Sequence, residues 1–167
     1  MNPLAAPFSL DGGALGQLMR SGRWLYPTVE IIHIFGFVLL VGSVLMFDLR
    51  LLGLNRQLPL TLMARHLLRW SMASLLLVVP AGLLMFSAHP QDFIGNRVFL
   101  LKMTLIMTAG LNAAIFHTGV WQGVARWDTG QTAPASARAH ALLSMLLWLS
   151  VIACGRMQAY TYNQICR

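Results

Sequence analysis

Five polar or ionisable side chains fall inside stretches of sequence that are otherwise apolar. Glu30 and His33 are three residues apart, and Arg156 and Tyr160 are four apart, so each pair shares one helix face if its stretch is helical. Lys102 is the fifth member. At 1.5 Å per residue, Glu30, Lys102 and Arg156 lie about 6 Å and His33 about 10 Å below the same membrane face. Because an ionisable group within a membrane is costly unless it is paired, the sequence predicts a polar pocket at this depth.

The chemistry of this pocket has two interpretations. We expect Glu30 to pair with Arg156 or Lys102 inside the bundle, with His33 beside them. The set could be a structural clasp that orients the helices, or it could receive a proton, a quinone headgroup or a cofactor propionate. Asn112 belongs to the same group of polar residues, since it lies in mid-span and is expected to hydrogen-bond across helices.

The histidines could instead ligate the iron of haem b. Two imidazoles must then lie at nearly the same depth, about 4 Å apart across the iron. His33 and His117 differ by about 18 Å in depth, so they cannot share one haem. The remaining pairings are His33 with His89 near one membrane face, and His117 with His66 or His140 near the other.

Helical phase weakens one of these pairings. His140 precedes Arg156 by sixteen residues, which places it about 160° further around the helix. If Arg156 points inward, His140 points outward, whereas His66 has no such conflict. The predicted haem ligands are therefore His33, His117, His66 and His89, and the sequence assigns no other metal site.

The composition of the chain indicates that these side chains lie within a membrane. The chain has 167 residues, of which 57% are hydrophobic and 10% charged, whereas soluble domains carry roughly a quarter charged residues. Its net charge of +7 arises from 12 Lys and Arg against only five acids, so it reflects scarce acids and not a nucleic-acid-binding patch. Two cysteines exclude a disulfide scaffold. An integral membrane protein is the class that fits.

Four stretches are long and apolar enough to span a bilayer, namely residues 26–47, 67–88, 98–120 and 139–160. We expect an all-α fold, a four-transmembrane-helix bundle over residues 26–162 with a tail at 163–167. We expect residues 1–25 to be an N-terminal interfacial segment, in which a short amphipathic helix begins at Ser9 or Asp11 and ends near Gly22; the alternative is a disordered segment. Pro27 suits the first turn of the first span, and Pro80 should free a carbonyl in the second.

Four spans place both termini on one side, called face A here, together with the turn at 89–97. Face B holds the turns at 48–66 and 121–138. Arginines are somewhat more numerous near face B, so the positive-inside rule places face B in the cytoplasm and the termini in the periplasm of a bacterial inner membrane. The face B arginines are Arg50, Arg56, Arg65, Arg69, Arg126 and Arg138.

Several short strings resemble an uncharacterised bacterial family of four-helix integral membrane proteins, a domain of unknown function. They are Tyr-Pro-x-x-Glu-x-x-His at 26–33, Asp-Leu-Arg-Leu-Leu-Gly at 48–53, Ala-Gly-x-Asn-x-x-x-Phe-His at 109–117 and Gly-Arg-x-x-Ala-Tyr at 155–160. The resemblance covers roughly residues 15–162. It implies the four-helix fold and draws attention to the polar residues in the strings, but it implies no activity.

The leading functional hypothesis is a small electron-transfer protein that binds haem b through intramembrane histidines. It would exchange electrons with a quinone or a partner membrane subunit. The alternative is a non-catalytic subunit or scaffold of a larger complex, whose buried charges are structural. A metal-handling or transport protein is the weaker third class. In each case the chain contacts the lipid bilayer, can form oligomers, and is not expected to be an enzyme on its own.

Overall fold

The computed structural model describes residues 13–165, without the side chains of Asp92 and of residues 159–165. Within this range every regular element is a helix. The elements are α1 (Gly13–Ser21), α2 (Leu25–Leu52), α3 (Leu60–Ala88), α4 (Pro90–Ile94), α5 (Arg97–Thr118), the 3-10 helix η1 (Val120–Arg126) and α6 (Ala135–Ile165).

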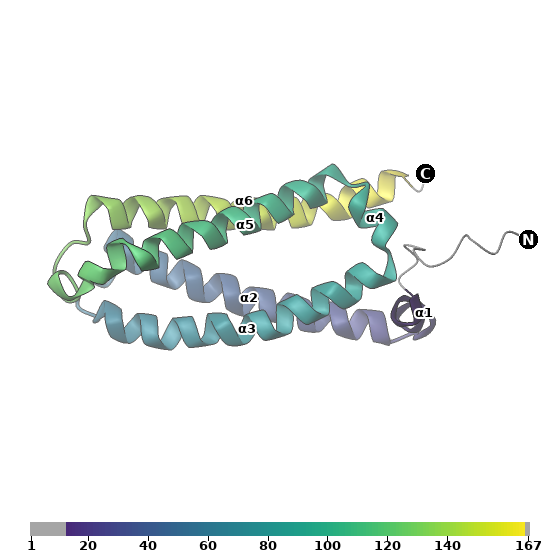
Figure 1. Cartoon of the computed structure of the whole chain (residues 1–167), viewed down its shortest axis with the longest axis horizontal. Coiled ribbons are helices and arrows are strands. Elements are labelled where there is room, and N and C mark those ends of the chain that lie inside the picture. Colours follow the sequence, from purple (N-terminus) through teal and green to yellow (C-terminus); the bar gives the residue numbers. More distant parts are fainter. Residues whose placement is uncertain (1–12, 166–167) are drawn as a thin grey trace, which may run out of the picture.

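Four of these helices are long and apolar enough to cross a membrane, as the sequence predicted. They are α2, α3, α5 and α6, and α1 and α4 lie at the end of the bundle that corresponds to face A (Figure 1). Pro27 occupies the first turn of α2, as expected. The N-terminal helix is present as α1, although Ser9 and Asp11 lie outside the described residues. Arg20 fastens its end to the bundle by donating to the Ala88 carbonyl, at 2.6 Å.

The long helices pack in the order α3, α2, α6, α5. α2 packs most extensively on α3, α5 packs on α6, and a smaller contact between α2 and α6 joins the two pairs. Gly36 permits the close approach of α2 to α3, because a Cβ there would lie 2.9 Å from Val78 Cγ2. In the described part of the chain, α3 and α5 share no extensive contact. The bundle is therefore two helix pairs joined along one edge (Figure 1).

Helix α3 begins seven residues before the predicted span. The turn that joins α2 to α3 is short and held by backbone hydrogen bonds, so the second helix can begin early. Gly53 ends α2 in the left-handed region, with φ 111°, and its N–H donates to the Arg50 carbonyl. The N–H of Leu54 donates to the Leu49 carbonyl at 3.0 Å. This is the Schellman pattern, which favours glycine at the left-handed position. The chain can then enter α3 directly after Pro59.

Candidate functional site

His33 links α2 to α3. Its Nδ1–H donates to the Val78 carbonyl at 2.9 Å. Gly82, one turn further along α3, leaves room for the ring, because a Cβ there would lie 3.0 Å from His33 Cε1. Pro80 lies between these two positions inside the helix. Pro80 has no N–H, so it leaves the Leu76 carbonyl without its helical donor. His33 donates to the Val78 carbonyl and not to this freed one.

Glu30, His33 and Lys102 belong to the pocket predicted near face A, and in the described part of the chain no hydrogen bond or ion pair joins them. Both Glu30 and Lys102 lie close enough to His33 for their charges to act on it. Lys102 is half-buried and also lies near Cys154, and a Cβ at Gly155 would lie 4.0 Å from its Nζ. Glu30 itself is exposed and, among the described residues, forms no ion pair.

The other two members of the predicted pocket are placed differently. The Arg156 side chain is exposed on α6, and it has an interaction partner of its own. The side chain of Tyr160 lies outside the described residues. The prediction that Arg156 completes the pocket with Glu30 stays a prediction.

A second group of polar side chains lies in the half of the bundle nearer face B. Asn112 on α5 is buried, and its amide nitrogen donates to the His140 carbonyl on α6 at 3.1 Å. The His140 Nδ1–H donates back to Asn112 Oδ1 at 2.7 Å. The mid-span asparagine thus bonds across helices, as expected. His140 points inward and Arg156 outward, so the two lie on opposite sides of α6, as their spacing requires. The sequence analysis assumed the opposite orientation, with Arg156 inward and His140 outward.

Asp48 and His117 complete this group. Asp48 on α2 is 4% exposed and lies close to the Ser144 side chain on α6. The Nδ1–H of His117 donates to the Ala113 carbonyl at 2.8 Å. Within the described part of the chain, Asp48 Oδ2 and His117 Nε2 are buried without a hydrogen-bond partner. Phe116 packs against both histidines, with its ring centroid 5.3 Å from that of His117 and 5.9 Å from that of His140.

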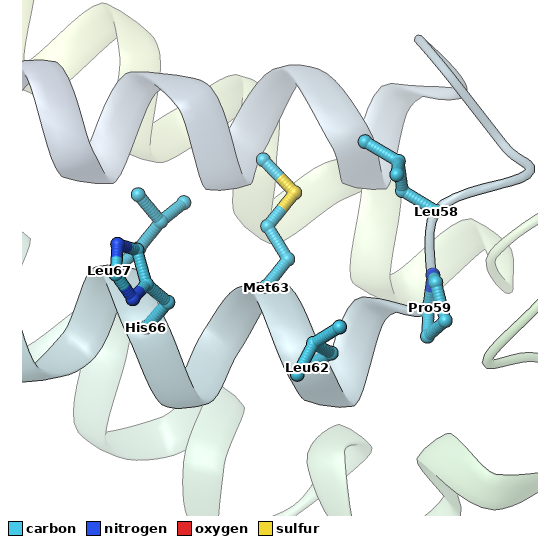
Figure 2. A pocket seen from close by; sticks show the side chains of 6 residues that line it. All are labelled: Leu58, Pro59, Leu62, Met63, His66 and Leu67. Carbon is cyan, nitrogen blue, oxygen red and sulfur yellow. The ribbon is translucent and has the colours of Figure 1, made fainter.

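The remaining two histidines are exposed. His89 packs edge-on against Tyr26 at 6.0 Å between ring centroids, at face A. His66 packs against Trp70 at 6.4 Å on α3. It also lines an open hollow of about 200 Å³ beside α2 (Figure 2), together with Leu58, Pro59, Leu62, Met63 and Leu67. No cluster of three or more His, Cys, Asp or Glu side chains suited to a metal occurs among the described residues.

A sequence model described as a family of unknown function, DUF6644, matches residues 12–161. The chain belongs to the DUF6644 family. The resemblance predicted from the sequence strings is thereby confirmed. No curated protein and no solved structure shows significant similarity to this family member.

The structure accounts for one of the strings on which the resemblance to a family of unknown function rested. In Asp-Leu-Arg-Leu-Leu-Gly, Asp48 is buried close to Ser144 of α6, and Gly53 ends the helix. Arg50 is 3% exposed, and its guanidinium bonds to three backbone carbonyls. Nη2 donates to Arg56 O at 2.9 Å, to Leu58 O at 2.8 Å and to Asp128 O at 3.0 Å, and Nε donates to Leu58 O at 3.0 Å. The string therefore fastens the α2–α3 turn to the segment before α6.

Sequence reasoning assigned Arg50 to the membrane rim and set His140 aside, and it did not pair Asp48 with Ser144. One signal could have grouped the last pair with His140, because Ser144 follows His140 by four residues and so shares its helix face. The target of Arg50 had no such signal, since Asp128 lies 78 residues away in the sequence.

Proposed function

We propose that this DUF6644 protein is a non-catalytic membrane subunit or scaffold, in which the intramembrane polar side chains tie the helices together. The observation that carries the proposal is their distribution. His33 bonds α2 to α3, the reciprocal Asn112–His140 pair bonds α5 to α6, and the buried Asp48 lies close to Ser144 where α2 meets α6. These are the three extensive contacts between the long helices.

Such ties have a physical purpose in a lipid environment. Lipid tails are as apolar as the helix surfaces, so the hydrophobic effect does not press one transmembrane helix against another. Packing and interhelical hydrogen bonds must do so, and each bond contributes on average about 0.6 kcal/mol. Polar side chains at each of these helix contacts therefore support a role in holding the bundle in one arrangement.

Haem b is the second candidate, and the buried, unpartnered His117 Nε2 favours it. A ligating histidine commonly donates its other ring N–H to a carbonyl, as His117 does to Ala113. The partner ring is harder to supply. The buried Phe116 ring contacts both His117 and His140, so these two do not flank an open slot of the kind a porphyrin needs. The pairing of His117 with His140 therefore fits bis-histidine ligation poorly.

An absorption spectrum combined with four single substitutions separates the two functions. Protein expressed with ample haem and purified in a mild detergent should be colourless. His33→Ala and Asn112→Ala should each lower the unfolding temperature, because each removes a tie, whereas His66→Ala at an exposed position serves as the matched control. A Soret band that His117→Ala abolishes would overturn the scaffold proposal and establish haem binding.

The partners of the scaffold remain part of the proposal. We place the protein in a bacterial inner membrane with its termini in the periplasm, in contact with a partner membrane subunit of a larger complex or with a quinone. The argument for a cytoplasmic face B is the arginine count: five exposed arginines lie near face B, against Arg20, Arg23 and Arg97 among the described residues near face A. Arg50 is excluded from that count because its charge is turned toward backbone carbonyls.

A further inference from the structure

A layer of buried polar side chains crosses the region where α2, α5 and α6 meet. Asp48 is 4%, Asn112 6% and Ser144 8% exposed, and each comes from a different one of these helices. Along its own helix each lies between members of two apolar clusters, so the three lie at the same level of the bundle. His140 joins the layer through its two bonds with Asn112. The cluster toward face A includes Val41, Ala109 and Leu147, and the cluster toward face B includes Leu51, Phe116 and Ala141.

The Asp48 carboxylate has no counter-charge in this layer. Its Oδ2 atom is buried without a hydrogen-bond partner, and Asp48 forms no ion pair among the described residues. The nearby Arg50 guanidinium bonds to backbone carbonyls of the turns. The Nδ1–H groups of His140 and His117 are donated to a side-chain amide and to a backbone carbonyl. The ionisable side chains of α3, which also packs on α2, are all exposed.

A carboxylate in such a place needs a positive charge from outside the chain. An unpaired charge in the low-dielectric interior of a membrane protein is strongly unfavourable. One carboxylate balances one unit of charge, so a divalent metal would leave an excess positive charge within the membrane. The hydroxyl and amide oxygens of the layer suit hard cations and not soft metals. The layer therefore fits one small cation of single charge.

The position of Asp48 in α2 indicates the side from which such a cation enters. Helix α2 runs from Leu25 to Leu52. At 1.5 Å per residue, Asp48 lies about 6 Å from the face B end of the helix and about 35 Å from the other end. The shorter path to water therefore leads to face B.

We propose that the Asp48 carboxylate binds one monovalent cation, a proton or a sodium ion, inside the membrane and exchanges it with the aqueous phase at face B. Ser144 lies close to Asp48 and can offer a second oxygen to a sodium ion, whereas a proton needs only a lone pair of the carboxylate. The scaffold role rests on the bonds of His33 and of Asn112 with His140, so the two proposals can fail separately.

Heat unfolding of the full chain in a neutral detergent tests the proposal. In alkaline buffer, sodium chloride replaces choline chloride at constant ionic strength, and in choline chloride alone the pH is lowered stepwise. The native chain is compared with Asp48→Asn, which removes the charge and keeps the size of the side chain. Glu30→Gln is the matched control, because it makes the same change at an exposed acid of the same helix. Ser144→Ala separates the two ions.

We expect the unfolding midpoint of the native chain to rise with sodium or with falling pH. Asp48→Asn should lose this response, and Glu30→Gln should keep it. Sodium at roughly a hundredfold excess over its Kd should raise the midpoint by about 5–11 °C. A proton bound only by the folded chain stabilises it as the pH falls, by about 3–5 °C for each unit of pH. Ser144→Ala should raise the Kd for sodium several-fold and leave a proton response unchanged.

Three results overturn the proposal. They are a native chain whose midpoint responds to neither ion, an Asp48→Asn chain that responds as the native chain does, and an equal loss of response in Asp48→Asn and Glu30→Gln. If Asp48→Asn does not fold, two measurements on chains with Asp48 intact decide. Calorimetric titration of the native chain detects bound sodium, and the infrared band of a protonated carboxyl at neutral pH, retained in Glu30→Gln, detects the proton. The absence of both signals overturns the proposal.

Discussion

Replacing Arg50 with alanine should loosen the whole face B end of the molecule. The guanidinium makes four hydrogen bonds to three carbonyls, which belong to the α2–α3 turn and to Asp128. A buried polar group left without its partner costs about 1–3 kcal/mol. These carbonyls lie in turns near the membrane surface, where water can replace part of the loss, so we take the lower value for each. The expected destabilisation is about 3 kcal/mol.

Heat unfolding in detergent, followed by tryptophan fluorescence, measures this effect. For a chain of this size, 1 kcal/mol corresponds to roughly 2–4 °C, so Arg50→Ala should lower the midpoint by about 6–12 °C. Trp127, which is buried next to Asp128, makes the fluorescence sensitive to this end of the fold. Trypsin should also cleave faster after the exposed Arg126, because the segment containing it is no longer fastened.

Two further variants sharpen the test. Arg50→Lys keeps the charge, but one ammonium group cannot reach all three carbonyls, so it should fall between native and Arg50→Ala. Arg56→Ala is the matched control, since the Arg56 side chain is exposed and bonds only to Gly53 O and Thr132 Oγ1 among the described residues. If Arg50→Ala melts no lower than Arg56→Ala, the guanidinium does not fasten the two segments and the reasoning is refuted.

Two other substitutions probe contacts that only the folded chain creates. Asp128 accepts from Thr61 N at 2.7 Å and from Thr61 Oγ1 at 2.8 Å, so it caps α3 from a distant segment. Asp128→Ala should cost about 1 kcal/mol and accelerate hydrogen exchange at the start of α3. If exchange in Asp128→Asn is accelerated as much as in Asp128→Ala, the capping role is contradicted. Gly82→Val should displace the His33 ring and cost about 1–3 kcal/mol in heat unfolding. The control is Gly110→Val, where a Cβ would meet nothing within 4 Å; equal effects at both positions would count against the close contact with His33.

Much of the fold was predictable because hydropathy is a local property. Any helix that crosses lipid must be apolar over about 20 residues, and the four spans are found where this pattern placed them. Their ends were less accurate. The start of α3 was placed seven residues late because Arg65, His66 and Arg69 resemble a polar turn, although a helix longer than the hydrocarbon layer can carry such residues beyond it.

The candidate site was predictable only in part. Intramembrane polar residues could be recognised one by one, and the cross-helix bond of Asn112 is present. Their partners could not be predicted. The spacing of residues along a helix shows which of them lie on opposite sides of that helix, but it does not show which side faces the bundle. For α6 the phase separated His140 from Arg156 correctly, and only packing against α5 showed that His140 is the inward one.

The sequence by itself determined that this is a four-span membrane protein with a few costly polar groups in its spans, because lipid imposes that pattern on any chain that crosses it. The tertiary structure decided where those groups are satisfied. Arg50 bonds to a carbonyl 78 residues away, and His33 to one 45 residues away. Backbone carbonyls are present in every residue and leave no mark in the sequence, so such partners appear only when the helices and turns are brought together.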